Sequence, residues 1–426
     1  MVLLSRIFIQ SYLHLYTPIL MVNINKQKIE EEISKGSAKS IISIIDHMVE
    51  YAHNLRASDI HINPKADSIK VRFRIDGVLQ DVFDIPREML MEIIGRIKIL
   101  SNLRMDEHQN FQDGRFRILT DKSETIDVRV AVSPSYYGES AVMRLLSEQA
   151  EKFTLESLGF SKENQKKIID GISKPYGMIL ATGPTGSGKT TTLYTILKIL
   201  NKKESAIITI EDPIEYAIDD IKQIQVNSRT TMTFANGLRS ILRQDPDIIM
   251  VGEIRDEDTA GLAVNTALTG HLLLSTLHTN DSATTLPRLL DMKVEPFLVA
   301  STVNIALGQR LVRKICEKCK KSKKLTEAEL KSLAETIKFK LPGDRKVYNG
   351  EGCEKCNMTG YDGRIGIHEV LVVDNSIREG ILKKVSADNI KQIAINNGMK
   401  TMIEDGLDKV FEGVTSLEEV LRVIHE

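Results

Sequence analysis

Apolar and polar residues follow two different periods along the chain, and the change of period separates two predicted regions. In the first region, Ile41 to Leu55 carries apolar residues three and four positions apart, which predicts a helix. Strict alternation from Ile69 to Ile75, ending at Asp76-Gly77, predicts a strand that enters a turn. We expect another helix over 87–103 and strands near 114–120 and 124–132. These elements predict a small α+β domain over 40–148.

Beyond about residue 151, short and wholly apolar runs replace the alternation, and helical patterns separate them. Strands that are buried on both faces have this pattern, as in a parallel sheet built from βαβ units. The predicted strands cover 178–182, 206–210, 248–251 and 271–276. We therefore expect an α/β domain over 149–426, with alternating apolar and charged residues predicting a helical tail over 375–426. Gly398, Gly406 and Gly413 are expected to end helices in this tail.

A glycine-rich loop stands between the strand at 178–182 and a helical pattern over 191–200. A glycine-rich turn with a chance lysine is the alternative, but strand, turn and helix in this order favour a phosphate-binding loop. Its backbone N–H groups and the helix N-terminus would hold phosphates, Lys189 would reach the outer ones, and the Thr190 hydroxyl would bind Mg²⁺. The loop and the residue after it are Gly183, Pro184, Thr185, Gly186, Ser187, Gly188, Lys189, Thr190 and Thr191.

Charged and polar side chains end the buried strands that follow this loop. Glu211 and Glu253 each follow an apolar run, and His278 follows the next one, while His271 stands at the head of that same run. In open α/β sheets the ligand lies beyond the carboxyl ends of the strands. We expect Glu253 to hold Mg²⁺ through water and to orient the attacking water, with Glu211 polarising or placing it. Which glutamate acts as the base is left open by the sequence.

Arginines recur in the apolar segments of the first domain. An arginine there needs a partner, because it cannot lose its charge by deprotonation. One explanation is a salt bridge inside the domain. The other is that some arginines contact the triphosphate of a neighbouring subunit and supply charge to the transition state. The arginines concerned are Arg72, Arg74, Arg115, Arg129 and Arg144.

The four cysteines form two Cys-x-x-Cys pairs, Cys316/Cys319 and Cys353/Cys356, separated by 33 residues. This pattern predicts a structural zinc site with four thiolates in a knuckle over 310–365, although the gap is long for a zinc ribbon and unpaired thiols are the alternative. Residues 310–324 hold eight basic side chains and one acid, Glu317. Such a run is either a solvated face or a contact for anionic lipid headgroups.

Composition restricts the partners of the chain. Its 426 residues include 57 basic and 58 acidic side chains, no tryptophan and only 5% aromatic residues, so a nucleic-acid surface is not expected. Residues 7–22 are apolar but interrupted, which favours neither a signal peptide nor a membrane span. This segment is either an amphipathic or packed helix or the result of a start assigned before Met21. Residues 26–40 are polar, so we expect 1–39 to be a terminal segment and linker.

Together these motifs resemble those of the type II secretion and type IV pilus assembly ATPases. Besides the phosphate loop, Ile210 to Tyr216 resembles the family's aspartate box, Leu242 to Asp256 its Walker B region, and Thr269 to Asn280 its histidine box. The resemblance covers 40–426 and implies a RecA-like nucleotide domain preceded by a small PAS-like domain, with ATP, Mg²⁺ and structural zinc as bound groups. Arg115, Arg129 and Arg144 match the family's arginines, whereas Gln109-Asn110-Phe111 stands where relatives often place a further arginine.

The resemblance further implies a homohexameric motor on the cytoplasmic face of the inner membrane. Such a motor would act on a polytopic platform protein and, through it, on pilins or pseudopilins. Only about 40 residues precede the shared region here, whereas secretion and extension motors usually carry a further amino-terminal docking domain. Two alternatives from other classes are a hexameric nucleic-acid translocase and a nucleotide-gated scaffold without hydrolysis. DNA-stimulated turnover would indicate the first, and absence of phosphate release the second.

Overall fold

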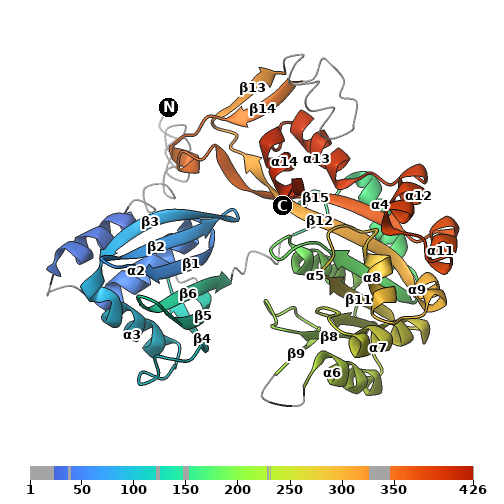
Figure 1. Ribbon diagram of the computed structural model, residues 1–426, viewed down its shortest axis with the longest axis horizontal. Helices are drawn as coiled ribbons and strands as arrows, with labels where there is room; N and C mark the ends of the chain where they lie inside the picture. Colours follow the sequence, from blue (N-terminus) through green and yellow to red (C-terminus); the bar gives the residue numbers. More distant parts are fainter. Residues whose placement is uncertain are drawn as a thin grey trace, which may run out of the picture. The chain divides into compact units, whose positions relative to one another are not determined.

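The computed structural model describes residues 24–36, 40–120, 125–146, 153–227, 230, 232–325 and 346–425 (Figure 1). The apolar segment 7–22 and Met21 lie outside these residues. Contacts divide the chain into two compact units, Met1–Glu148 and Gln149–Glu426. Each unit has its own sheet and its own hydrophobic core. Within the described residues, none of the helices combines the length and apolar character needed to cross a bilayer.

The first unit is built on a six-stranded antiparallel sheet in the order β3-β2-β1-β6-β5-β4. The predicted α+β character of this region is confirmed, and the helix expected over 87–103 is a short 3-10 turn followed by α3. The elements are α2 (Ile41–Asn54), β1 (Ala57–Pro64), β2 (Ser68–Ile75), β3 (Val78–Pro86), the turn Arg87–Met89, α3 (Leu90–Leu100), β4 (Gln112–Leu119), β5 (Thr125–Ser135) and β6 (Gly138–Leu146).

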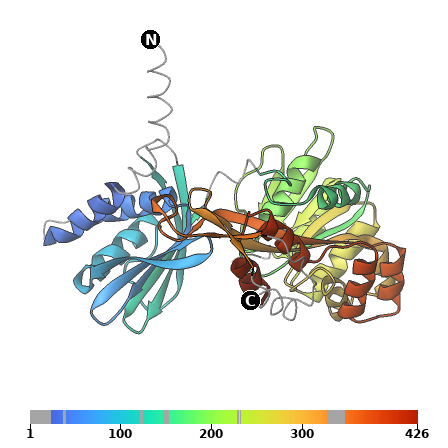
Figure 2. The ribbon, with the colours of Figure 1, turned by 90° about the horizontal axis from the view of Figure 1, so that it is seen from above.

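Alternation along the strands sends apolar side chains to one face of this sheet and charged ones to the other. Ile60, Phe73 and Val130 are buried in the core that α2 and α3 cover (Figure 2). Ser40 caps α2 by accepting a hydrogen bond from the Ser43 backbone N–H at 3.3 Å. The opposite face of the sheet carries the arginines that the sequence analysis singled out.

The predicted linker over 26–40 is wrong, because residues 24–34 form a helix. Its polar composition hides two apolar positions one turn apart, Ile29 and Ile33. Ile29 is fully buried and Ile33 packs against the core of the first unit. A narrow apolar stripe is enough for a helix to pack against a hydrophobic core. Because the other residues of this segment are polar, its composition alone predicts a linker.

The second unit contains a seven-stranded sheet in the order β15-β12-β7-β11-β10-β8-β9. The strands from β12 to β9 are parallel, and only β15 is antiparallel to its neighbour. The strands are β7 (Gly177–Thr182), β8 (Ile207–Glu211), β9 (Lys222–Gln225), β10 (Ile248–Val251), β11 (Leu272–Leu277), β12 (Val303–Ile315) and β15 (Tyr361–Val372). The parallel sheet predicted from the apolar runs is confirmed.

Helices cover both faces of this sheet. Along β7, Met178 and Leu180 belong to one core cluster, and Ile179 and Ala181 to the cluster on the other face. The second of these faces is covered by α4 (Lys162–Ile172) and α5 (Lys189–Leu200). The first face is covered by α6 (Phe234–Ile241), α7 (Glu257–Leu268), α8 (Thr285–Asp291) and α9 (Pro296–Thr302), with a 3-10 turn at Leu242–Gln244 after α6. Wholly apolar strands are what a sheet covered on both faces requires.

The predicted helical tail is also confirmed, as two pairs of helices near β12 and β15 (Figures 1 and 2). They are α11 (Asn375–Leu382), α12 (Ala387–Asn396), α13 (Met402–Phe411) and α14 (Leu417–His425). Gly398 and Gly413 follow helix ends with positive φ, as expected. Gly406 does not end a helix but lies inside α13, where an added Cβ would come within 2.8 Å of Val420 Cγ1. Close packing of α13 on α14 explains that glycine.

Candidate functional site

The phosphate loop joins β7 to α5, as the sequence predicts. Three of its glycines have positive φ angles: 141° at Gly183, 80° at Gly186 and 88° at Gly188. Lys189 is 8% exposed, and its Nζ donates hydrogen bonds to the carbonyl oxygens of Gly183 at 2.8 Å and Pro184 at 3.0 Å. Burial lowers the pKa of Lys189, and the charge of Glu253 partly opposes that shift. The lysine is thus held folded over its own loop.

The loop has the features of a receptor for phosphate. The helix N-terminus at Lys189 adds partial positive charge to the backbone N–H groups there. Ser187 Oγ is a buried polar atom that finds no hydrogen-bond partner among the described residues. Such an atom is explained by a ligand oxygen. Thr190 and Thr191 are partly exposed at the start of α5.

Gln309, on the neighbouring strand β12, supports the loop and was not identified from the sequence. Its side chain donates to the Ser187 carbonyl oxygen at 2.8 Å and accepts from the Thr192 hydroxyl at 2.6 Å. Its own carbonyl oxygen would lie 2.3 Å from a Cβ added at Gly183, which explains why glycine is required there. The contacts join residues 117 and 122 positions apart, so no local pattern in the sequence could reveal them.

Strand register brings Glu253 and His278 to the same edge of the sheet as the loop. Leu277 pairs with Thr182, the residue before Gly183, so His278 lies level with the start of the loop. Glu253 follows β10, and its Oε2 lies 3.1 Å from His278 Nε2. Its Oε1 accepts a hydrogen bond from Arg255, a second residue that sequence reasoning missed although it stands only two positions away. Glu253, Arg255 and His278 line a cavity of about 360 Å³ together with Arg288 from α8.

The charges around Glu253 keep it ionised. Burial acts to raise the pKa of its carboxyl, but the hydrogen bonds and charges of Arg255 and then of His278 outweigh burial, so the pKa is lowered. An ionised carboxylate at this edge can accept a proton or hold a water.

Glu211 ends β8 as expected, but its side chain is turned into the core. It is only 2% exposed, and its oxygens accept hydrogen bonds from Tyr194, from Thr209 at 2.6 Å and from Gln223 at 3.1 Å. Burial raises its pKa despite these bonds. The expectation that Glu211 polarises a water therefore needs correction, because in this conformation its carboxyl is fully engaged by protein donors.

His271 also needs correction, because it lies at the opposite edge of the sheet. It precedes β11, whose first residue, Leu272, pairs with Gly177 at the start of β7. A six-residue strand spans about 20 Å, which separates His271 from the phosphate loop of its own chain. Its Nδ1 lies 3.1 Å from the carbonyl oxygen of Thr266, at the end of α7. His271 and His278 directly precede and follow the six residues of β11, so the two histidines lie at opposite ends of this strand.

The arginines of the first unit form a row across its sheet. The register pairs Arg115 with Arg129, Arg129 with Arg144, and Arg144 with Asp59, whose other neighbour is Arg74. Asp59 binds two of them: its Oδ1 lies 3.0 Å from Arg144 Nε, and its Oδ2 lies 3.4 Å from Arg74 Nε. Arg115 is exposed and Arg129 half-buried. The salt-bridge explanation therefore holds for Arg74 and Arg144, at one end of the row.

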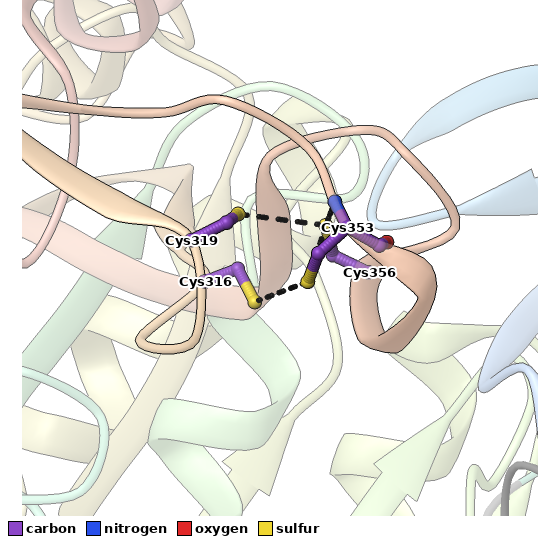
Figure 3. Close-up of side chains that lie close together, drawn as sticks. All are labelled: Cys316, Cys319, Cys353 and Cys356. Atoms are coloured by element: carbon purple, nitrogen blue, oxygen red, sulfur yellow. Dashed lines mark hydrogen bonds between the residues drawn. The ribbon is translucent and has the colours of Figure 1, made fainter.

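The two cysteine pairs meet in space (Figure 3). Cys316 and Cys319 follow β12, whereas Cys353 and Cys356 lie in and beside the 3-10 turn Glu354–Cys356. The four sulfurs all lie within 4.8 Å of one another. Three Sγ–Sγ distances are 3.9 Å (Cys316–Cys353), 3.8 Å (Cys319–Cys356) and 3.7 Å (Cys353–Cys356).

This arrangement fits a tetrahedral zinc ion. With Zn–S bonds of about 2.3 Å, the sulfurs of a tetrahedral site lie about 3.8 Å apart. Burial acts to raise the pKa of Cys356, but the backbone N–H groups of Cys353 and Gly360 outweigh it and lower the pKa to about 7. Donors aimed at a sulfur favour the thiolate that zinc requires. No disulfide joins these four residues.

The basic run next to the cysteines forms an exposed hairpin of β13 (Lys320–Lys324) and β14 (Lys346–Gly350). Lys321 pairs with Glu351 at 2.6 Å, and Lys320 lies 3.5 Å from Glu317. Other basic residues belong to the body of the unit instead. Arg310, for instance, is 9% exposed and donates to the Val423 carbonyl oxygen, and Arg313 pairs with Glu419. The eight basic residues of 310–324 are therefore not one surface.

A phosphate loop at the edge of a parallel sheet, with an ionised Glu253 after β10, two strands from the loop's own strand, defines a P-loop nucleotide-binding protein. The chain belongs to the family of type II/IV secretion system proteins, whose model matches residues 34–422. The family resemblance noted from the motifs is thereby confirmed.

Curated relatives support the same assignment. Type II secretion system protein E of Aeromonas hydrophila is 45% identical over 397 residues, which are 93% of this chain and 78% of the relative. Type IV pilus assembly ATPase PilB of Thermus thermophilus is 45% identical over 399 residues, again 93% of this chain but only 44% of the relative. The chain therefore spans less than half of that longer protein.

Solved structures share the fold. The ATPase DotB of Legionella pneumophila matches with a TM-score of 0.65 at 22% identity, over 89% of this chain and 95% of that one. The pilus retraction motor PilT, solved with bound ADP, matches with a TM-score of 0.59 at 25% identity, over 89% and 96%. The α/β fold class predicted for the nucleotide domain is confirmed.

Proposed function

We propose that this protein is an ATP-hydrolysing motor of the type that powers pseudopilus or pilus assembly, or type II secretion. The observation that carries the proposal is the register at the sheet edge: it aligns Glu253 and His278 with a phosphate loop whose lysine and glycines are in place. The names of the relatives, which include type II secretion proteins and pilus assembly ATPases, support this choice among P-loop activities.

Each residue at the edge has a role in this proposal. The backbone from Gly183 to Lys189 binds the β- and γ-phosphates of ATP, and the Lys189 ammonium neutralises charge that develops on them. Glu253 orients the attacking water and accepts its proton, while His278 holds the other carboxylate oxygen. Thr190 and, through water, Glu253 would hold Mg²⁺, which would supply Lewis-acid neutralisation of the phosphates.

The first unit completes the site of a neighbouring copy in a homohexamer. Arg115, Arg129 and Arg144 point from the open face of its sheet and stabilise charge on the transferred phosphoryl group. Asp59 keeps Arg144 oriented at one end of the row. Zinc bound by the four cysteines fixes the end of β12 and has no open coordination position, so its role is structural.

The motor acts at the cytoplasmic face of the inner membrane, on a polytopic platform protein that handles pilins or pseudopilins. No nucleic-acid substrate is proposed, because basic and acidic side chains balance and aromatic residues are few. Within the basic segment 310–324, the exposed lysines, among them Lys314, Lys318 and Lys321, are available for anionic lipid headgroups, whereas Arg310 is buried.

Phosphate release by the purified full chain tests the proposal. The wild-type protein should hydrolyse ATP with Mg²⁺, Lys189→Ala should lose both ATP binding and turnover, and Glu253→Gln should bind ATP without turnover. Arg239→Gln, an exposed change on α6, serves as the matched surface control. Turnover by Glu253→Gln within twofold of wild type would remove the catalytic role of that residue. A wild-type chain that binds ATP but releases no phosphate would overturn the motor proposal.

A further inference from the structure

Both oxygens of the Glu253 carboxylate are occupied by protein donors. Arg255 donates to Oε1, and His278 Nε2 lies 3.1 Å from Oε2. The Glu253 side chain is 14% exposed, whereas Arg255 is 56% and His278 52% exposed. A water that approaches Glu253 from solvent therefore meets its two partners first. Each oxygen can accept a further hydrogen bond, but release of one partner would leave that oxygen to a nucleophilic water alone.

Arg255 has a second carboxylate within reach. Its Nη1 lies 3.8 Å from Asp212 Oδ2, and Asp212 follows the end of β8, the strand beside β10. The guanidinium also lies over the Phe234 ring, 5.9 Å from its centroid. Arg255 thus stands between the carboxylates of two neighbouring strand ends. Arg255 can leave Glu253 and still have a charged partner in Asp212, so the change of partner costs little free energy.

Other charged groups also face Glu253, each from its own element. Lys189 acts from the start of α5, where the charge of Glu253 affects its pKa. His278 follows β11, and Arg288 lines the same cavity from α8. Of these groups, Arg255 and His278 are hydrogen-bonded to the Glu253 carboxylate. Arg255 is the one of the two that has an alternative acceptor.

We propose that Arg255 is a positioning residue that holds Glu253 in the nucleotide-free chain and moves to Asp212 when a nucleoside triphosphate binds, freeing Oε1 for the attacking water. This inference rests on the proposed function, because it assigns a role through Glu253. Before nucleotide binds, the guanidinium offsets a negative charge that would repel the triphosphate. Once it moves, Glu253 loses its strongest stabilising contact and becomes a better proton acceptor.

Steady-state ATP hydrolysis between about pH 5 and 9 tests the exchange in the full chain. In Arg255→Gln we expect kcat to fall roughly tenfold, as when an orienting partner is lost, with KM within threefold. The acid limb of its kcat/KM profile, which reports the nucleotide-free chain, should move to higher pH by about one unit, because Glu253 protonates more readily without the guanidinium. Arg255→Lys, which keeps the charge, should return the limb toward its wild-type position. Asp212→Asn should lower kcat and leave the limb unmoved.

Two further variants distinguish the effect of Arg255 on the pH profile from the effects of the charged groups near it. Arg288→Gln removes the same charge from the same cavity and should move the limb less than Arg255→Gln does. Arg255→Gln should also move the limb in a His278→Gln background, which excludes titration of the histidine as the cause. Arg239→Gln on α6 is the surface control, with kcat and KM unchanged.

The nucleotide-free protein gives a readout that needs no activity. Because the pKa of Glu253 is lowered in the folded chain, its stabilising effect is present above the ordinary carboxyl pKa and is lost as pH falls. The difference in Tm between wild type and Arg255→Gln should therefore be larger at neutral pH than near pH 4. Asp212→Asn should show a smaller difference at neutral pH.

The outcomes distinguish this inference from the proposed function. An unmoved acid limb in Arg255→Gln, or a raised KM with unchanged kcat, would overturn the role of Arg255 and assign it to nucleotide binding. Arg255→Gln with a Tm deficit that is the same at both pH values would do so as well. A wild-type chain without ATP hydrolysis would instead overturn the proposed function itself.

Discussion

The Tyr194 hydroxyl donates a hydrogen bond to the Glu211 carboxylate and thereby ties helix α5 to the end of strand β8. Tyr194 is fully buried, and its oxygen also accepts from the Glu215 backbone N–H at 3.3 Å. Burial, and then the Glu211 charge, raise the pKa of Tyr194, so the phenol stays protonated and remains a donor. The helix that begins at the phosphate loop is anchored to the strand end that leads to Asp212.

The Glu211–Tyr194 contact should stabilise the fold. Tyr194→Phe leaves a buried carboxylate with one donor fewer and should lower the free energy of unfolding by about 1–3 kcal/mol. Urea unfolding at neutral pH measures this, with Glu204→Gln on the exposed turn before β8 as the control. A Tyr194→Phe protein as stable as the wild type would show that the contact contributes nothing.

The raised pKa of Glu211 also gives a pH dependence with a definite sign. The folded state keeps the Glu211 proton to higher pH than the unfolded state does, so this residue lowers stability as pH rises above the ordinary carboxyl pKa. Glu211→Gln should remove that contribution, and its Tm relative to wild type should increase between about pH 5 and pH 8. A constant difference across this range would contradict the assigned shift.

Glu419 should show the opposite dependence. It is 2% exposed and binds Arg313 and Arg422; burial acts to raise its pKa, but these two arginines outweigh burial and lower the pKa to about 2. Its stabilising effect is present above the ordinary carboxyl pKa and disappears as pH falls toward 2. Glu419→Gln should cost about 3 kcal/mol at pH 7 and much less near pH 3.

Thermal or urea unfolding at the two pH values measures the effect of Glu419→Gln. The adjacent Glu418→Gln is the matched control, because Glu418 is exposed on the same helix α14. An equal loss of unfolding free energy in both variants at pH 7 would show that the position of Glu419 between two arginines does not contribute to stability.

The cysteine cluster should hold about one zinc per chain. Metal analysis of Cys353→Ser should find little zinc, and its Tm should fall together with that of wild-type protein treated with a chelator. Met358→Leu, an exposed change in the same turn, should keep both metal and Tm. A Cys353→Ser protein with wild-type zinc content would exclude the four-thiolate site.

The arginine row should act between subunits. Arg129→Gln should reduce turnover by roughly 10³-fold if it stabilises the transition state as an arginine finger does. Arg117→Gln, on the same sheet face and paired with Asp127 at 2.7 Å, is the control and should be close to wild type. Mixing Arg129→Gln with Lys189→Ala protein should restore activity, because an intact arginine can then meet an intact loop. No restoration in the mixture would place the arginine in its own chain's site, or nowhere near a phosphate.

Sequence patterns predicted the features that repeat along the chain or obey a fixed spacing. Buried strands, the loop from Gly183 to Thr190 and the cysteine pairs are of this kind, since period and spacing are local. The directions of side chains, and contacts between residues that are distant in the sequence, were not predicted. Glu211 looks the same in sequence whether its carboxyl faces the nucleotide edge or the core, and Tyr194, which decides the matter, lies 17 residues away.

The position of His271 likewise depends on strand register, which the sequence does not show. Both histidines flank one apolar run, and only the register of β11 against β7 reveals that they lie at opposite ends of it. Arg255 could have been found, because an arginine two residues after a strand-end glutamate often reaches back to it. Its second partner, Asp212, could not, because the two lie 43 positions apart in the sequence.

Strand β12 extends from beside the phosphate loop to the cysteine cluster. Gln309, near its middle, contacts the loop, and Cys316 follows its last residue. The seven residue steps from Gln309 to Cys316 span about 23 Å of strand, which is hydrogen-bonded to β15. One continuous strand therefore fixes the separation between the phosphate loop and the cysteine cluster, so the end of β12 that carries Cys316 is positioned by the same strand that supports the loop.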